Sequence, residues 1–287
     1  MFDQVVFAGG GHRCWWQAGF WDVVASEIKL RPKVIAGVSA GAATACLLHA
    51  NNSRDALDYY RELLKPEARN AYWGNLVRRG ERVFPHAGIY RQALKTLLGG
   101  EHYQRLMTTA PEIRISFARI PSWLGPRLAV LAGMAAYNFE KHTTQPLHPT
   151  YGRKLGFKSE VVRIQDCKNE DELISLIMAS SCTPPFTPIE YREGRPTMDG
   201  GMVDNVPVDA VEAEGGSTLV LTSRCYKQHA PVFMREGRVY VQPSAKPSST
   251  SWDYTRPDNY EDTYKLGRMD GHQFLINFAF KKRPSLG

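Results

Sequence analysis

The chain has 287 residues, 43% of them hydrophobic, with a formal net charge of +7; this is typical of one large or two small globular domains. Its five cysteines are far apart and form no CxxC pair, which argues against a disulfide framework and a structural zinc site. No uncharged stretch approaches the ~20 apolar residues that a membrane-spanning helix needs.

The first fifty residues predict two strand–turn–helix units. Residues 4–8 and 34–37 are short apolar runs typical of buried strands, and residues 15–28 and 40–50 are typical of helices. Successive units of this kind predict a parallel sheet with right-handed crossovers, so the expected fold class is α/β.

The rest of the chain continues this mixture. We expect mostly helices over residues 53–107, with Ser53 as the N-cap of a helix over 56–64. Further predicted elements are strands at 112–120, 160–165 and 217–222, helices at 171–180 and 260–280, and a surface loop at 242–258. Because we find no repeat or clear linker, we expect a single domain over 1–287, with a core at about 4–222, a helical insertion at about 51–156 and a C-terminal extension at about 223–287.

Residues 128–136 carry no charge and follow Pro126, which suits the first turn of a helix. One interpretation is a helix buried in the core. The other is a lid or a membrane-docking face, flanked by Trp123 and Tyr137 as interfacial aromatics. The final helix, over 260–280, leaves a similar choice between packing against the sheet and membrane contact.

A serine stands between two glycines at the second strand-to-helix turn. Residues 37–41 read Gly-Val-Ser-Ala-Gly, so Ser39 lies between Gly37 and Gly41. This is the arrangement of a nucleophile elbow, in which a sharp turn strains the serine backbone and exposes its hydroxyl. Side chains at the glycines would clash with neighbouring chain. The pattern predicts acyl transfer through serine.

The first strand-to-helix turn carries three consecutive glycines and, two residues later, an arginine. Consecutive glycines can point several backbone N–H groups into one concavity that binds negative charge, and the arginine adds a positive charge. The start of the helix after Ser39 adds further free N–H groups. These features predict an oxyanion hole formed by Gly9, Gly10, Gly11, Arg13 and Ala40.

An aspartate in a glycine turn is the candidate for the base. Asp199 is followed by Gly200 and Gly201, just after a possible strand end. An aspartate beside a serine can take its proton, but a free carboxylate with a pKa of about 4 is a poor base at neutral pH. We therefore expect a hydrophobic cleft that raises this pKa, or a very direct hydrogen bond.

Together these motifs resemble those of the patatin-like phospholipases, lipid acyl hydrolases of plants, animals and bacteria. The glycine-rich turn looks like the family's oxyanion loop, residues 37–41 like its nucleophile elbow, and residues 199–208 like its aspartate motif. Residues 178–188 are similar to its small-residue helix end and proline turn. The similarity runs from about residue 5 to residue 222, and Cys14 departs from it where the family often has glycine.

The resemblance implies a patatin-like, three-layer α/β/α fold with a mainly parallel sheet and helical insertions. It also implies a catalytic dyad of Ser39 and Asp199 without a histidine, in which the serine attacks an ester carbonyl and water hydrolyses the acyl-enzyme. The implied substrate is a phospholipid or lysophospholipid, and the reaction needs no metal or other cofactor. Residues 128–136 then become candidates to line or cover the acyl channel.

Other interpretations use the same residues. An α/β-hydrolase has the order Ser…Asp…His, which Ser39, Asp199 and His272 follow, with His229 as a second candidate histidine. An acyltransferase or thioesterase would use the same dyad with another acyl acceptor. A third possibility is a protein that only binds lipids and whose site is catalytically inactive.

The positive charge fits an anionic surface, either phospholipid head groups or nucleic acid. The sequence has neither a stripe of alternating basic and aromatic residues nor a helix crowded with basic residues, so we expect no nucleic-acid partner. Separated cysteines fit a reducing compartment, and the chain start does not resemble a signal peptide. We expect a cytoplasmic protein with peripheral membrane contact.

Overall fold

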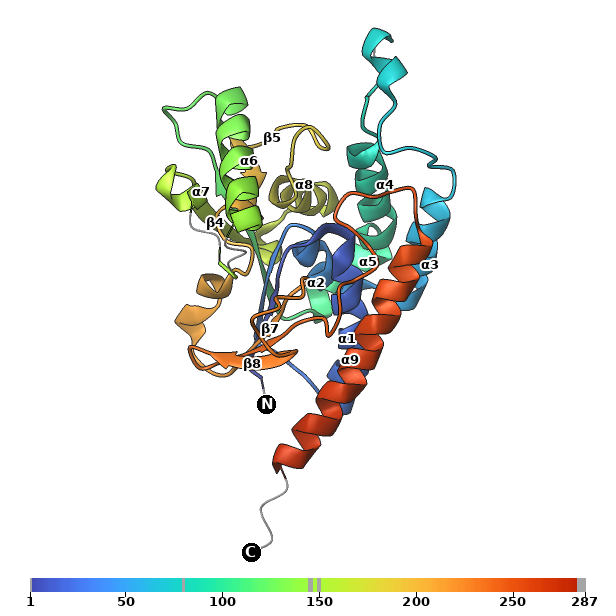
Figure 1. Cartoon of the computed structure of the whole chain (residues 1–287), viewed down its shortest axis with the longest axis vertical. Helices are drawn as coiled ribbons and strands as arrows, with labels where there is room; N and C mark the ends of the chain where they lie inside the picture. The colour runs from blue at the N-terminus through green and yellow to red at the C-terminus, as the bar shows by residue number, and fades with distance from the viewer. Residues whose placement is uncertain (1, 79–80, 144–146, 149–150, 283–287) are drawn as a thin grey trace, which may run out of the picture.

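The computed structural model describes residues 2–78, 81–143, 147–148 and 151–282. Within them, nine strands form one sheet (Figure 1): β1 (Gln4–Phe7), β2 (Val34–Val38), β3 (Glu112–Arg119), β4 (Lys158–Arg163), β5 (Glu190–Arg192), β6 (Arg195–Asp199), β7 (Thr218–Leu221), β8 (Val232–Arg235) and β9 (Arg238–Val241). The central strands β3, β2, β1, β7 and β9 are parallel. Antiparallel β8 completes one edge, and antiparallel β4, β6 and β5 complete the other. The α/β fold class with a mainly parallel central sheet is confirmed.

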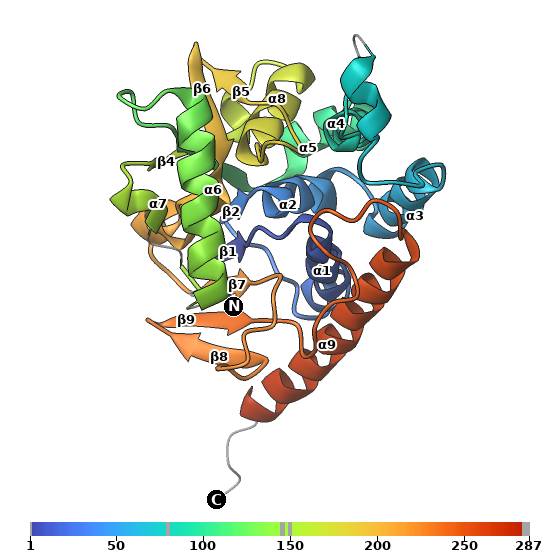
Figure 2. The same cartoon turned by 45° about the horizontal axis from the view of Figure 1, so that its top comes forward.

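The central strands are buried on both faces. Every residue of β1, β2 and β7 is buried, as expected for parallel strands covered on both sides. One face packs on α1 (Trp15–Glu27), α2 (Ala40–Ala50) and α8 (Glu170–Ser180). The other face packs on the 3₁₀ helix η5 (Val208–Ala210) and on α6 (Pro126–Thr143) (Figure 2). The result is three layers.

The helices between β2 and β3 agree with the sequence pattern except at one cap. After α2, the α-helices of this segment are α3 (Ser53–Leu64), α4 (His86–Leu98) and α5 (Glu101–Thr109). The predicted N-cap at Ser53 is wrong: the side chain of Asn52 caps α3 by accepting bonds from the Arg54 N–H at 2.8 Å and the Asp55 N–H at 3.2 Å. The Ser53 hydroxyl instead donates to Asp22, so the preceding asparagine serves as the cap.

The buried-helix interpretation of residues 128–136 is wrong. Of the residues whose side chains the structure describes there, Ala129 is fully buried, whereas Leu128 is 62% and Leu131 is 67% exposed. Ala129 packs against Met198 and Met202. The helix thus contacts the sheet layer through Ala129, Val130 and Gly133 and turns its leucines toward solvent. The side chain of Tyr137 lies outside the described residues.

The C-terminal part of the chain contributes to the same sheet and its cover. Strands β8 and β9 come from the segment expected beyond the core. The last helix, α9 (Asp258–Lys282), packs along α1 rather than directly on the sheet (Figure 2); the Trp16 Nε1–H donates to Asp270 at 2.7 Å and the ring of Phe20 meets that of Phe274. Residues 242–257 form a loop as predicted, but Gln242, Ser249 and Tyr254 are buried, so the loop does not lie wholly on the surface. Within the described residues, every helix is too short or too polar to span a bilayer.

Candidate active site

Ser39 occupies the sharp corner between β2 and α2. Its backbone has φ 54° and ψ −133°, a conformation that costs a non-glycine residue on the order of 1–3 kcal/mol. A Cβ on Gly37 would lie 2.7 Å from the Ala42 Cα, and a Cβ on Gly41 would lie 2.5 Å from the Ala8 carbonyl oxygen. Only glycine fits at both positions, so the local geometry is that of a nucleophile elbow.

Strand β3 brings the serine and the aspartate together. β2 ends with Val38 opposite Ser116 of β3, while β6 runs the other way and ends with Asp199 opposite Phe117. The two strand ends therefore meet at adjacent residues of β3. There the Ser39 Oγ donates a 2.6 Å hydrogen bond to the Asp199 Oδ2.

The surroundings of Asp199 hold its carboxylate in place and change its acidity. The Gly201 N–H donates to Oδ1 at 2.7 Å, and the Thr183 hydroxyl donates to Oδ2 at 3.2 Å. Burial raises the pKa of Asp199 to about 6, against the opposing effect of these bonds and of the positive charge of Arg224. Such a carboxylate is still ionised at neutral pH and accepts a proton more readily than an ordinary aspartate.

Ser180, at the end of α8, orients the backbone of the elbow. Its hydroxyl accepts the Ser39 N–H at 2.7 Å and donates to the Ser116 carbonyl at 2.6 Å. Gly200 also lies against that carbonyl, where a Cβ would approach the oxygen to 2.6 Å. The resemblance of residues 178–188 to a family motif does not by itself indicate this position of Ser180.

Two cavities meet at Ser39. One is apolar, with a volume of about 100 Å³, and the other is more polar, with a volume of about 230 Å³. Ser39 lines both, together with Gly11, Ser251 and Trp252. The last two residues come from the long loop at 242–257, which therefore forms part of the wall between the cavities.

The apolar cavity runs between α2 and α4. Its lining residues on α2 recur at helical spacing, and those on α4 face them: Ala40, Ala43, Thr44 and Leu47 on α2, and Tyr90, Ala93, Leu94, Leu97 and Leu98 on α4. At 1.5 Å per residue, the α2 face extends about 10 Å from the elbow, which suits an extended apolar chain. Leu128 and Leu131 line neither cavity at Ser39, so the expectation that residues 128–136 line the acyl channel is wrong for these two. That they cover the channel stays a prediction.

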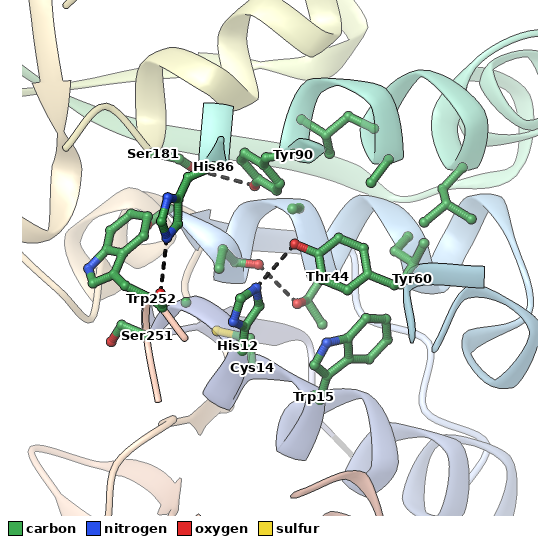
Figure 3. Close-up of a pocket in the computed structure, with 18 of the residues that line it drawn as sticks. His12, Cys14, Trp15, Thr44, Tyr60, His86, Tyr90, Ser181, Ser251 and Trp252 are labelled. Carbon is green, nitrogen blue, oxygen red and sulfur yellow. Dashed lines mark hydrogen bonds between the residues drawn. The ribbon is translucent and has the colours of Figure 1, made fainter. Parts of the chain in front are cut away.

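Two histidines line the apolar cavity beside the rings of Tyr60 and Trp252 (Figure 3). The His12 Nε2 is 3.1 Å from the Tyr60 hydroxyl, and the His86 Nε2–H donates to the Trp252 carbonyl at 3.0 Å. Burial lowers the pKa of His12 to about 3 and also lowers that of His86. Both rings are therefore neutral at neutral pH, which keeps this cavity uncharged.

The more polar cavity has positive charge on its wall. It is lined by Arg13 and Arg224, with Thr183, Asn205 and Phe186 among its other lining residues. Arg13 was expected here from the first turn, but Arg224 follows β7 and belongs to no motif. The two guanidinium groups favour an anionic group close to Ser39.

The glycine-rich turn reaches the site only in part. The Gly9 N–H donates to the Asn205 carbonyl at 3.0 Å, so the expectation that Gly9 contributes to an oxyanion hole is wrong for its amide. Gly10 and Gly11 line the more polar cavity, and their N–H groups have no acceptor among the described residues. Ala40 begins α2 beside Ser39 and lines the apolar cavity.

Cys14, the residue that departs from the family pattern, follows this turn and lines the apolar cavity (Figure 3). Its thiol donates to the Ala8 carbonyl at 3.6 Å, and burial raises its pKa to about 12. The thiol is thus a packing group. Among the described residues, no group of three His, Cys, Asp or Glu side chains could hold a metal ion.

The candidate histidines of a triad lie elsewhere. His272 is exposed on α9, and the ring of His229 stacks on Phe233 with centroids 4.3 Å apart. Neither lines a cavity at Ser39. Only the order Ser…Asp…His suggested these two histidines, and the order of residues in the chain does not indicate how close they lie to Ser39.

One comparison with known proteins identifies the family to which these motifs belong. A family model for patatin-like phospholipase matches residues 5–211, most of the chain. The crystal structure of VipD from Legionella pneumophila is 10% identical with a TM-score of 0.44, over 96% of this chain and 67% of that one. Human GIVD cytosolic phospholipase A2 is 9% identical with a TM-score of 0.48, over 97% of this chain and 62% of that one. No curated protein matches the sequence.

Proposed function

The chain belongs to the patatin-like phospholipase family, and we propose that it is a lipid acyl hydrolase that cleaves fatty acyl esters of phospholipids or lysophospholipids. One observation carries this proposal. The 2.6 Å hydrogen bond between Ser39 and Asp199 lies where an apolar cavity and a more polar, basic cavity meet. An ester bound at Ser39 would place its acyl chain in the first cavity and its head group in the second.

In the first half of the reaction, the Ser39 Oγ attacks the ester carbonyl carbon while the Asp199 Oδ2 takes the hydroxyl proton. Negative charge develops on the former carbonyl oxygen. The N–H groups of Gly10, Gly11 and Ala40 are the donors that stabilise it. When the C–O bond breaks, the leaving alcohol takes the proton from Asp199, and the acyl group remains on Ser39.

In the second half, water attacks the acyl-enzyme. Asp199 accepts a proton from the water, the acyl–serine bond breaks, and the proton returns to the Ser39 oxygen. The products are a fatty acid and the regenerated hydroxyl. Each step uses the same short contact between the two residues, which supports a role for Asp199 as base and then acid.

The substrate class follows from the charges around the site. Arg13 and Arg224 suit a phosphate group close to the scissile ester, whereas the uncharged channel between α2 and α4 suits the acyl chain. A neutral ester would gain nothing from the positive charge of these two side chains on the wall of the cavity. We therefore place phospholipids and lysophospholipids ahead of neutral lipid esters.

Incubation with diacyl phospholipid and with lysophospholipid tests the proposal, with mass spectrometry of the products. The unaltered protein should release free fatty acid, and Ser39→Ala should release none. Ser26→Ala is the matched control, because Ser26 lies on α1 away from both cavities. Equal release by Ser39→Ala, or transfer of the acyl group to an added alcohol in place of fatty acid release, would contradict the proposal.

A further inference from the structure

The short 3₁₀ helix η2 (Trp73–Val77) projects from the body of the molecule (Figure 1) and has no buried residue. Its large apolar side chains are strongly exposed, Trp73 by 64%, Leu76 by 70% and Val77 by 91%. Single exposed apolar residues are ordinary on a protein surface, but three in one short turn form a patch. We call Trp73, Leu76 and Val77 the exposed tip.

A row of aromatic rings connects the exposed tip to the site. The ring centroid of Trp73 lies 5.9 Å from that of Phe84, and Phe84 lies 5.3 Å from Phe186. Phe186 stacks on Trp252 at 4.8 Å, and Trp252 lines both cavities at Ser39. The row is a continuous apolar surface from the outermost part of the chain to the candidate nucleophile.

The chain around the exposed tip is basic. Residues 65–82 contain five basic and two acidic side chains: Lys65, Arg69, Arg78, Arg79 and Arg82 against Glu67 and Glu81. Arg78 is 68% exposed and lies 3.7 Å from Glu81, a surface pair that water screens strongly. Apolar side chains that basic residues flank in the sequence fit a lipid surface that carries anionic head groups.

The chain leading into α6 forms a second exposed apolar element at the same end of the molecule (Figures 1 and 2). Trp123 is 74% exposed, Leu128 62% and Leu131 67%. Two exposed apolar elements at one end of the molecule can both reach the same flat surface, as a bilayer would require.

We propose that the exposed tip and the start of α6 form a docking surface for anionic bilayers. Docking places the aromatic row against the lipid, so an acyl chain can pass from the bilayer to Ser39 in contact with apolar side chains. This proposal rests on the proposed function for its purpose, because a lipid hydrolase must reach substrate held in a membrane. Binding itself is measured without hydrolysis.

Vesicle sedimentation tests the docking surface, with all proteins carrying Ser39→Ala so that the lipid stays intact. The vesicles are phosphatidylcholine alone and phosphatidylcholine with phosphatidylserine. The triple variant Trp73→Ser, Leu76→Ser, Val77→Ser should bind the mixed vesicles at least about tenfold more weakly. Arg78→Glu with Arg82→Glu should remove the preference for phosphatidylserine.

The matched control is Met269→Ser with Ile276→Ser, which removes two exposed apolar side chains from α9 (67% and 50% exposed) and should leave binding unchanged. Circular dichroism checks the fold of each variant. The proposal is overturned if the tip variant binds as tightly as the parent, if the α9 control weakens binding equally, or if the parent binds neither vesicle. Failure of lipid hydrolysis, with tip-dependent binding intact, would count against the proposed function alone.

Discussion

Ser39 and Asp199 are 160 residues apart in the chain, yet their side chains share a 2.6 Å hydrogen bond. The reason is that β3 pairs with both strands that carry them, through the adjacent residues Ser116 and Phe117. The contact is therefore held by the backbone hydrogen bonds of a buried sheet. Such precision matters because a misplacement of about 1 Å can cost about 10²-fold in rate.

Removing either member of this pair should abolish hydrolysis. We expect Ser39→Ala and Asp199→Asn to lower kcat/KM for a chromogenic ester by at least about 10³-fold, since the two residues act as a unit. His229→Ala and His272→Ala should retain most activity because neither histidine lines a cavity at Ser39. A folded but inactive His272→Ala variant would favour the triad of an α/β-hydrolase.

Activity should fall in mild acid. Burial raises the pKa of Asp199 to about 6, and the base must be ionised to accept the serine proton. As the pH falls through 6, the carboxylate becomes protonated, so kcat/KM should drop about tenfold per pH unit and should be level above pH 7. A pH–rate profile of the free enzyme measures this, and constant activity down to pH 4 would contradict it.

Thr183 should influence the pH at which activity is half-maximal in the pH–rate profile. Its hydroxyl donates to the Asp199 Oδ2 at 3.2 Å and so favours the ionised carboxylate. Thr183→Val should move the midpoint to higher pH, and Thr183→Ser should restore it. A loss of activity with an unchanged midpoint would indicate that Thr183 only supports the local structure.

The channel between α2 and α4 should select for acyl-chain length. Ala43 lines it about one turn of α2 beyond Ser39, so the ring introduced by Ala43→Phe would fill the channel close to the reacting carbonyl. Hydrolysis of long-chain esters should fall at least about tenfold relative to acetyl esters. The matched control is Ala135→Phe on the exposed side of α6, which should keep the original preference; equal losses for both chain lengths would refute this assignment.

His12 should make the fold sensitive to acid. Burial lowers its pKa from 6.5 to about 3, so between these values the unfolded chain binds a proton that the folded chain does not. The free energy of unfolding therefore decreases as the pH falls, and for this group the loss between pH 7 and pH 5 is about 1–2 kcal/mol. Asp199 acts in the opposite direction, because its folded-state pKa is raised.

Replacing the imidazole ring of His12 should show how much it contributes to the pH dependence of the free energy of unfolding. His12→Phe keeps an aromatic side chain among Tyr60, Tyr254 and Tyr260 but cannot take up a proton. Urea unfolding at pH 7 and pH 5 should show a smaller loss of stability for the variant than for the parent. An identical difference between the two pH values would contradict a buried neutral His12.

Features that depend on neighbouring residues were predictable from the sequence. The apolar run before Gly37 and the helix-forming run after Ser39 predict the strand, the elbow and the helix, and α2 begins and ends at the predicted residues. Backbone preferences act over a few residues, so a short pattern is enough to indicate them. The error at Ser53 shows how far such local patterns can be trusted. Asn52 and Ser53 are both good N-cap residues, so the sequence does not decide between them.

Features that depend on distant residues were decided by the tertiary structure. The pairing of β3 sets the distance between Ser39 and Asp199, and the packing of α2 against α4 leaves the apolar channel. Arg224 and Trp252 reach the site from segments without any motif, and the leucines of α6 face solvent although their composition suits a core. Burial and contact arise from segments that meet only after folding, so the composition of one segment cannot determine them.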